Sequence, residues 1–378
     1  MAFEGQGTMI STKIPPESTH TFINRNKIPK FQYPVISDEK FTLVMDSLTM
    51  DRLGRFQNRT VLSMGTAAAG KIFQDVSLGI AFSVRPQPDN WTRTLTFISS
   101  KHPYLMHTIQ TVTAIHDRYI NGQFESRSTL DEVYHLAQAA ASFNQKLSGP
   151  IRSEDRDALW ATAGLLSQIV FAFVDASKPE EAWPLAPPDP SDLEWITMSE
   201  NKMAIWHITN PLRPDSIFKP LAEYLAKNAK ELCTALLPVM ENLPPLFTKV
   251  YDLDNEAIAD TCPYRETVNV LSGLLAMECN RETLLNFLSF ASHMQPKFKP
   301  LLRQKDPRAL LLLAYWYAQT MNTIWWIDRR ATMECRAICI YLEKNYPQET
   351  DILELLQFPR ERCGLRTWKY PVLQHISM

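Results

Sequence analysis

Apolar residues recur every three or four positions through most of this chain, and that period predicts amphipathic helices. The pattern begins at Ser37, and its first stripe contains Phe41, Val44, Met45 and Leu48. Before it, residues 1–36 are polar, include four prolines and show no sustained period, so we expect a flexible N-terminal tail. No segment alternates clearly between apolar and polar residues, so we predict no strand.

The segment "SSKHPYLMHTIQTVTAIHDRYI" predicts a helix with a recognisable start. We expect Ser99 or Ser100 to cap it, and Pro103 falls in the first turn, where a missing backbone N–H costs nothing. Its inward face is predicted to contain Leu105, Ile109, Val112 and Ile115.

Two further helices follow along the chain. Thr129 and Glu132 have the spacing of a capping box, in which each side chain satisfies a free backbone N–H at the helix start. From Ala158 to Val174 the chain is apolar nearly all round, as in a helix buried on every side.

The last third has the strongest helical pattern. Asp306 is placed to cap a helix that Pro307 opens, and a second helix is expected after the "WWIDRR" junction, ending near Tyr346. Shorter helices are predicted at 191–208, 217–237, 263–279 and after a cap at Asn280. In total we expect about ten to twelve helices and an all-α fold.

The stretch "MGTAAAGKIF" contains most of a phosphate-binding P-loop, with Gly65, Gly70 and Lys71 at the required spacing. Ile72 stands where the motif needs a Ser or Thr hydroxyl to bind Mg²⁺. The flanking apolar residues have a helical period, whereas a P-loop follows a strand. We therefore predict no nucleotide site and interpret the glycines as close-approach points on a packed helix.

Composition narrows the class of protein. The chain has 378 residues, 45% hydrophobic and 21% charged, which is ordinary for a globular protein. A formal net charge of −2 without any basic run gives no reason to expect direct binding to nucleic acid. The most apolar run, Ala309–Ala318, is too short to cross a bilayer, and no secretory signal opens the sequence.

Six cysteines are scattered along the chain without a C-x-x-C pair. Cys335 and Cys339 share one helix face, but a metal site would need two more ligands and no histidine lies in that segment. We interpret the cysteines as buried small hydrophobic residues in a reducing compartment, and we predict no metal and no cofactor.

Motifs of catalysis are absent from the sequence: there is no H-E-x-x-H and no G-x-S-x-G. Asp189 and Asp192 lie in a Pro-rich link rather than on facing helices, as a Mg²⁺-dependent all-α enzyme would need. His102 precedes the helix at 103–120, and His107 and His116 fall on its opposite faces, so we assign these histidines to core or capping roles. We predict no catalytic residue.

Charged groups in the first half are expected to act locally. The three arginines within residues 51–59 are spaced as on one helix face, which we expect to be solvated. At the end of the helix at 103–120, His116, Asp117 and Arg118 are expected to form local ion pairs.

Aromatic and methionine side chains are concentrated in the last third of the chain. Two predicted helices there contain Trp316, Tyr317, Met321, Trp325 and Trp326. Core packing accounts for such a group. The alternative is the wall of an apolar ligand pocket, because Met and aromatic side chains adapt to irregular hydrophobic ligands. We name these five as candidate pocket residues and leave both interpretations open.

Four segments, in this order, resemble the C-terminal regulatory domain of fungal zinc-cluster transcription factors of the sterol uptake control type. They are "DEKFTLVMDSLT", "NWTRTLTFISSKHPYLMHTIQTVTAIHDRYI", "YHLAQAAASFNQKLSGPIRSEDRDALWATAGLLSQIVFAF" and "DPRALLLLAYWYAQTMNTIWWIDRRATMECRAICIYL". The second contains the hallmark, a Trp followed by a Ser-x-His-Pro-aromatic-Leu helix start. The resemblance covers about residues 37–358, which we predict to be one domain between the tail 1–36 and a C-terminal tail 359–378.

The resemblance implies a single large irregular helical bundle with an apolar internal pocket that binds a sterol-like ligand and controls transcription. It also implies a nuclear protein of a lipid or secondary-metabolite pathway, with a cytoplasmic location in the inactive state left open. Residues 1–36 lack the cysteines of the family's zinc cluster, so we expect no direct DNA binding by that device. The C-terminal end also differs from the family's usual ending.

Two functions remain open at this point. The first is a transcription-regulator-like protein that binds a hydrophobic small molecule, sterol- or polyketide-like, or a protein partner of the transcription machinery, with a homodimer left open. The second is a stand-alone enzyme, cyclase- or isomerase-like, acting on a hydrophobic natural product in the same cavity. Its first residues to test are His107, Asp328, Arg329 and the Trp325–Trp326 pair. We favour the first.

The helical interpretation of "MGTAAAGKIF" makes a testable prediction. Lys71→Ala should leave stability and function nearly unchanged, because Lys71 points away from the apolar stripe. Ala68→Leu should lower the free energy of unfolding by about 1–3 kcal/mol through overpacking. Urea unfolding of both variants measures the difference, and a functional loss confined to Lys71→Ala would instead support a phosphate site.

Overall fold

The computed structural model describes residues 35–38, 41–62, 91–122, 127–235, 243–255, 261–280, 283–294 and 298–365. Most of these residues are helical, and the predicted all-α fold is confirmed. The chain divides into two compact units, Met1–Asp175 with Asp189–Ala229, and Ala176–Pro188 with Lys230–Met378. Each unit is described by itself.

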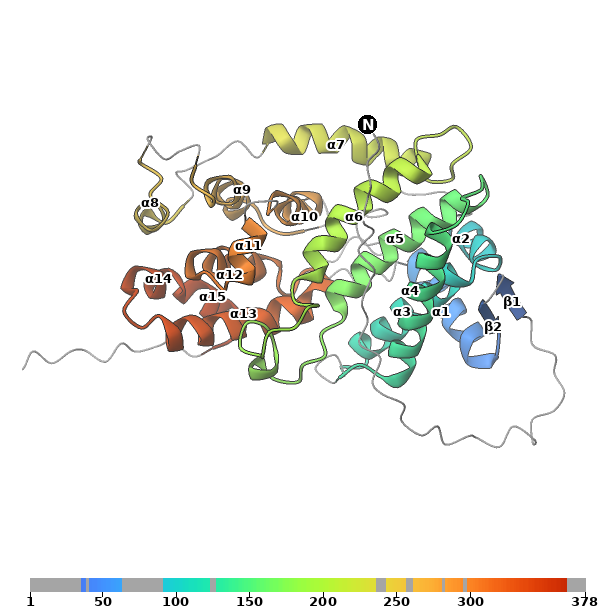
Figure 1. The fold of residues 1–378 in the computed structure, drawn as a ribbon, viewed down its shortest axis with the longest axis horizontal. Coiled ribbons are helices and arrows are strands. Elements are labelled where there is room, and N and C mark those ends of the chain that lie inside the picture. Colours follow the sequence, from blue (N-terminus) through green and yellow to red (C-terminus); the bar gives the residue numbers. More distant parts are fainter. Residues whose placement is uncertain are drawn as a thin grey trace, which may run out of the picture. The chain divides into compact units, whose positions relative to one another are not determined.

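The first unit contains a hairpin and the helices labelled α1 to α6 in Figure 1, and α7 leads out of it. The bounds are β1 Val35–Asp38, β2 Phe41–Val44, α1 Ser47–Leu62, α2 Trp91–Ser99, α3 Pro103–Ile120, α4 Leu130–Leu147, α5 Asp155–Ala172, α6 Glu194–Thr209 and α7 Lys219–Ala235.

The second unit contains the remaining helices. The bounds are η2 Pro179–Glu181, α8 Pro245–Val250, α9 Arg265–Leu275, α10 Leu284–His293, α11 Phe298–Arg303, α12 Pro307–Thr320, α13 Trp325–Asn345, α14 Thr350–Leu355 and α15 Gln357–Arg362. Four of these, α8, α11, α14 and α15, span six residues each. Six residues are too few to show a 3.6-residue period, so the sequence pattern did not separate them.

The start of the helical pattern was predicted wrongly. A helix was expected from Ser37 and no strand anywhere, but β1 and β2 form an antiparallel hairpin in which Val35 faces Val44 and Asp38 faces Phe41. The first helix begins at Ser47, where the Asp46 carboxylate accepts a hydrogen bond from the Thr49 backbone N–H at 2.8 Å. A four-residue strand is about as long as one helical turn, so its apolar residues cannot show whether the period is 2 or 3.6. The hairpin was therefore taken for the start of a helix.

Helix α3 is the central helix of the first unit and packs against α1, α4 and α5. The four residues predicted to face inward are fully buried, and so is almost every other residue of the helix. Its threonines can be buried because their hydroxyls donate to carbonyls four residues earlier. Thr108 donates to Tyr104 at 2.6 Å, and Thr113 donates to Ile109 at 2.7 Å.

The start of α3 was predicted in part. Pro103 is its first residue, as expected. Neither Ser99 nor Ser100 caps it: Ser99 is the last residue of α2, and the N-cap of α3 is His102. The His102 ring instead bonds the Tyr104 hydroxyl at 3.0 Å, so this residue joins the buried polar contacts of the core.

Two of the three arginines expected on a solvated face, Arg52 and Arg55, form ion pairs with other helices instead, and the side chain of Arg59 lies outside the described residues. Arg52 pairs with Asp131 of α4, and Arg55 pairs with Asp117 of α3 at 3.1 Å as well as with Asp51. Asp117, expected to pair locally at the end of α3, thus has a partner on α1. These ion pairs attach α1 to α3 and α4.

A buried ion pair joins α3 to α4. Arg118 donates two hydrogen bonds to the Glu132 carboxylate, at 2.9 and 3.1 Å, and both side chains are almost fully buried. Thr129 caps α4 as predicted, accepting from the Glu132 backbone N–H at 3.2 Å. The Glu132 side chain does not complete the capping box, because Arg118 takes both of its carboxylate oxygens.

Helix α5 is buried on nearly every side, as its sequence predicts, although it ends at Ala172 rather than Val174. Two buried acids lie in its first turn, Asp155 and Asp157, and Asp157 is fully engaged. The carboxylate accepts from Arg213 at 2.7 Å, from the Ser216 hydroxyl at 2.8 Å and from the Ile217 backbone N–H at 3.2 Å. This acid therefore fixes the segment that leads to α7 within the first unit.

The second unit is organised around α12 and α13, which pack against each other and against α15. Asp306 caps α12 by accepting from the Ala309 N–H at 2.9 Å, and Pro307 opens it, as predicted. Helix α13 begins at Trp325, so the "WWIDRR" junction belongs to the helix instead of preceding it. The N-cap of α10 is Thr283 rather than Asn280, although the Asn280 side chain accepts a hydrogen bond from the Thr283 backbone N–H at 3.1 Å.

Several predictions fall on residues that the structure does not describe. "MGTAAAGKIF" lies wholly outside the described residues, as do residues 1–34 of the expected N-terminal tail. The first residues of the expected C-terminal tail belong to α15, and Pro359, Arg360 and Cys363 are buried. The expected boundaries of one domain at 37–358 stay a prediction.

The Arg118–Glu132 pair makes a stability prediction. Glu132→Gln should lower the free energy of unfolding by about 3–5 kcal/mol, because it leaves Arg118 as a buried charge without a counter-charge. The double variant Arg118→Met with Glu132→Leu should recover most of that loss. Urea unfolding followed by circular dichroism measures both.

The matched control is Glu154→Gln, at an exposed ion pair with Arg152. It should change stability by no more than about 0.5 kcal/mol. Equal losses in Glu132→Gln and Glu154→Gln would contradict the importance of the buried pair.

Candidate functional site

The five candidate pocket residues lie together in the second unit, at the end of α12, in the loop after it and at the start of α13. Each of them, Trp316, Tyr317, Met321, Trp325 and Trp326, has at most 2% of its surface exposed. Such burial is common to a packed core and to the wall of a closed apolar cavity. The pocket therefore stays a prediction.

The polar atoms of two of these side chains are engaged by neighbouring helices. The Trp316 indole N–H donates to the Phe287 carbonyl of α10 at 2.8 Å, and its ring stacks on Phe290 with centroids 5.5 Å apart. The Tyr317 hydroxyl donates to the Glu334 carboxylate of α13 at 2.5 Å. These hydrogen bonds fix the orientation of both side chains within the second unit.

Glu334 is the centre of a small buried network. It accepts from Tyr317 and also pairs with Arg330, one turn earlier on α13. Burial raises the pKa of Tyr317 well above its ordinary value, and the Glu334 charge raises it further. The network thus keeps a neutral phenol beside a carboxylate whose charge is balanced by a guanidinium.

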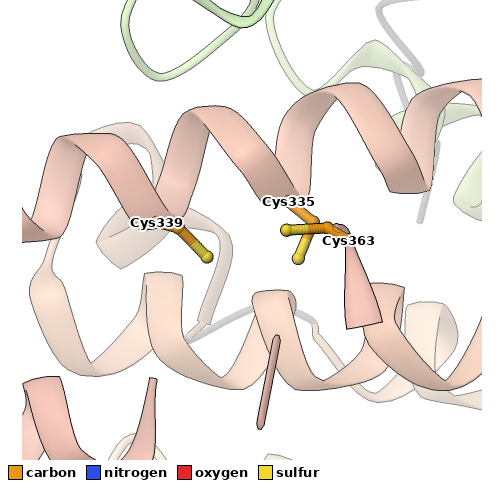
Figure 2. A group of neighbouring side chains, drawn as sticks. All are labelled: Cys335, Cys339 and Cys363. Atoms are coloured by element: carbon orange, nitrogen blue, oxygen red, sulfur yellow. The ribbon is translucent and has the colours of Figure 1, made fainter. Parts of the chain in front are cut away.

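Three cysteines converge next to this network. Cys335 and Cys339 lie one turn apart on α13, and Cys363 is the residue that ends α15. Figure 2 shows the side chain of Cys363 beside that of Cys335, with Cys339 on the same side of the helix. Their sulfur atoms all lie within 4.8 Å of one another, and each side chain is buried. We call Cys335, Cys339 and Cys363 the thiol cluster.

Backbone groups of two helices hold the thiol cluster in place. The Cys335 thiol lies 3.7 Å from the Ala314 carbonyl of α12 and 3.8 Å from the Pro359 carbonyl of α15. On the other side, the Arg336 guanidinium donates to the Cys363 carbonyl at 2.7 Å. The cluster therefore sits where α12, α13 and α15 meet.

The three thiols are not equivalent electrostatically. Hydrogen bonds from Cys335 and Cys339 lower the pKa of Cys363, helped by the Leu365 backbone N–H and the Arg336 charge. Burial raises the pKa of Cys335 and of Cys339 above the ordinary value. The shift at Cys363 thus depends on the two thiols that lie beside it.

Sequence reasoning predicted the burial of Cys335 and Cys339 correctly but not the third member of the cluster. Cys363 comes from a six-residue helix that the periodicity did not reveal. The signal that was present is the i, i+4 pair in "CRAIC" followed by one more cysteine in "ERCG". Among the described residues, the thiol cluster is the group of three His, Cys, Asp or Glu side chains whose ligand atoms lie close enough together to share one metal ion.

A pair of histidines forms a second buried titratable group, in the first unit. The Nδ1 atoms of His107 and His135 lie 2.9 Å apart, and both rings are buried. Burial lowers the pKa of His107 to about 3, and the neighbouring His135 contributes to that shift. Burial also lowers the pKa of His135 to about 4, although Asp131 opposes the shift. Both rings are therefore neutral at physiological pH.

The residues suggested for an enzyme are engaged in structural contacts. His107 belongs to the first unit, whereas Asp328 and Arg329 belong to the second. Asp328 accepts from the Asn322 backbone N–H at 2.8 Å, and Arg329 donates to the Ala176 carbonyl at 2.6 Å. Neither unit contains all three.

Asp189 and Asp192, the nearest approach to a carboxylate pair, fold into one turn. Asp192 accepts from the Asp189 backbone N–H at 2.8 Å, and Asp189 accepts from the Ser191 backbone N–H at 2.9 Å. Their oxygens serve the backbone of their own loop. They do not belong to a metal-binding group of the described residues.

Comparison of the chain with protein-family models, curated proteins and solved structures finds no match. The family resemblance therefore stays a prediction from the sequence. Among the described helices, none is both long and apolar enough to span a membrane.

The histidine pair makes a prediction on pH. Both pKa values fall below the ordinary 6.5, so folding favours the neutral rings. The stability they contribute is complete above about pH 6.5 and is lost as the pH falls from there toward about 4 and then 3. Each histidine contributes a slope of up to about 1.4 kcal/mol per pH unit in that window.

Carboxylates titrate in the same window, so the test compares slopes between variants. The free energy of unfolding of His107→Gln should fall less steeply between about pH 6 and 4.5 than that of the unmodified chain. His207→Gln, at an exposed position on α6, is the control and should keep the original slope. Identical slopes in all three proteins would contradict a buried neutral pair.

Proposed function

We propose that this chain is a transcription-regulator-like protein of a fungal lipid or secondary-metabolite pathway. It resembles the C-terminal regulatory domain of zinc-cluster transcription factors of the sterol uptake control type. In this proposal it binds a hydrophobic small molecule, sterol- or polyketide-like, or a protein partner of the transcription machinery. Its residues contain no C-x-x-C pair with which to form a zinc cluster of their own.

The observation that carries the proposal is the agreement between three of the four resembling segments and the buried helices; the first segment, residues 38–49, covers β2 and only the start of α1. The hallmark segment spans α2 and α3, and α3 is the central helix of the first unit. The next segment spans most of α4 and all of α5. The closing segment spans α12 and most of α13 in the second unit. A resemblance that falls on core helices concerns the fold as a whole, whereas one confined to loops would not.

The small molecule is favoured over a protein partner by the chemistry of the closing helices. The candidate pocket residues are three tryptophans, one tyrosine and one methionine, all buried. Large flat aromatic faces and a flexible thioether suit a rigid, mostly apolar ligand of the sterol or polyketide class. A protein partner would need exposed groups, and these five offer none. A nuclear location and a homodimer remain part of the proposal.

Extraction of the purified chain tests the proposal directly. We expect mass spectrometry of an organic extract to reveal a sterol- or polyketide-like molecule near one equivalent. The fluorescent sterol dehydroergosterol should then bind the extracted protein, with energy transfer from the tryptophans. Trp326→Phe should weaken binding several-fold, since an aromatic contact contributes about 0.5–1.5 kcal/mol.

The matched control is Trp160→Phe on α5, which changes the same side chain outside the candidate pocket. It should leave dehydroergosterol affinity unchanged, and circular dichroism should confirm that both variants fold. No extracted molecule together with no energy transfer would contradict a hydrophobic ligand and favour the protein partner. Equal weakening in both variants would contradict the location of the pocket.

A further inference from the structure

We propose that the thiol cluster, Cys335, Cys339 and Cys363, binds a single copper(I) ion in a three-coordinate, all-sulfur site. This inference rests on the geometry of the second unit and does not depend on the proposed function.

The spacing of the sulfur atoms fits a metal ion at their centre. Metal–thiolate bonds of about 2.3 Å place three sulfurs about 4 Å apart around a trigonal ion. The three sulfurs of the cluster already lie within 4.8 Å of one another. Closing that distance needs side-chain movements of less than about 1 Å on average, which rotation about the Cα–Cβ bonds supplies.

The number and type of ligands select the metal. Soft thiolate ligands favour Cu(I), zinc and iron–sulfur clusters. Structural zinc sites take four ligands, and iron–sulfur clusters are held by four cysteines or by cysteines with histidines. Among the described residues no fourth His, Cys, Asp or Glu joins these three. A buried set of three thiolates therefore suits copper(I), which is stable with three sulfur ligands.

The charges around the cluster also suit a bound monovalent ion. Binding breaks three S–H bonds, forms three Cu–S bonds and releases three protons to solvent, with no change in oxidation state. The product carries a net charge of −2. The Arg336 guanidinium donates a hydrogen bond to the Cys363 carbonyl. Arg360 of α15 lies near Cys339, and Arg360 forms an ion pair with Glu343. Arg336 therefore brings a positive charge to one side of the cluster, whereas the charge of Arg360 is shared with Glu343.

Hydrophobic packing alone does not account for the arrangement. Packing as small apolar groups does not by itself require three sulfurs to lie within 4.8 Å of one another. Here two come from successive turns of α13 and the third from the end of α15. A shared ion would tie α15 to α13, so metal binding should also stabilise the C-terminal part of the second unit.

The test is an anaerobic titration of the reduced full-length chain with copper(I), supplied as its acetonitrile complex, against the chelator bicinchoninate. We expect the chain to withdraw one equivalent of copper from the chelator. X-ray absorption of the complex should show three sulfur neighbours at about 2.3 Å. The midpoint of thermal unfolding should rise in the copper-loaded protein.

Substitutions locate the site. Cys363→Ser, at the end of α15, and Cys339→Ser should each lower copper affinity by at least about 100-fold, because each removes one of three ligands. Cys279→Ser is the matched control, since Cys279 is also buried in the second unit but lies outside the cluster. It should bind copper as the unmodified chain does. Circular dichroism checks folding, and Cys363→Ala is a second variant should Cys339→Ser not fold.

Three results would overturn the proposal. The first is no uptake of copper against bicinchoninate. The second is an affinity that stays the same in Cys363→Ser and Cys363→Ala. The third is a site that takes one equivalent of zinc(II) in preference to copper(I), with four ligands by X-ray absorption, which would contradict the three-coordinate assignment.

Discussion

A helix that is buried on every side has no solvent-facing surface on which to leave a polar group, and this constraint governs both units. In α3 the threonines donate to carbonyls of their own helix. Arg118 and Glu132 neutralise each other between α3 and α4, and Asp157 accepts three hydrogen bonds at the start of α5. Because a buried polar group without a partner is costly, each of these contacts fixes one arrangement of helices against the alternatives.

The same constraint shapes the second unit. Tyr317 donates a hydrogen bond to Glu334, and Trp316 donates one to a carbonyl of α10. The cysteines of α13 lie next to Cys363 at the end of α15. The five candidate pocket residues and the thiol cluster are separate groups of side chains on these helices. The two proposals use different side chains and fail independently.

Long, strongly periodic segments and local end signals could be predicted from the sequence, as with the all-round burial of α5, Pro103 in α3 and Asp306 as the cap of α12. The hairpin was missed because four-residue strands carry too little pattern. Arg118 with Glu132, and Cys363 with Cys335, were missed for another reason: their partners are distant in sequence, and only packing decides which charges and thiols meet. The candidate pocket residues were found as a group, but periodicity describes a packed core and a ligand cavity in the same way.

Amide hydrogen exchange, followed by mass spectrometry, tests the central claim that the closing helices of the second unit enclose a hydrophobic ligand. The chain as purified is compared with the chain after extraction of bound lipid. The account predicts that α12 and α13 lose protection on extraction, while α3, in the first unit, keeps its own. Unchanged protection of α12 and α13 would show that these helices are a packed core without a ligand, and would contradict the account.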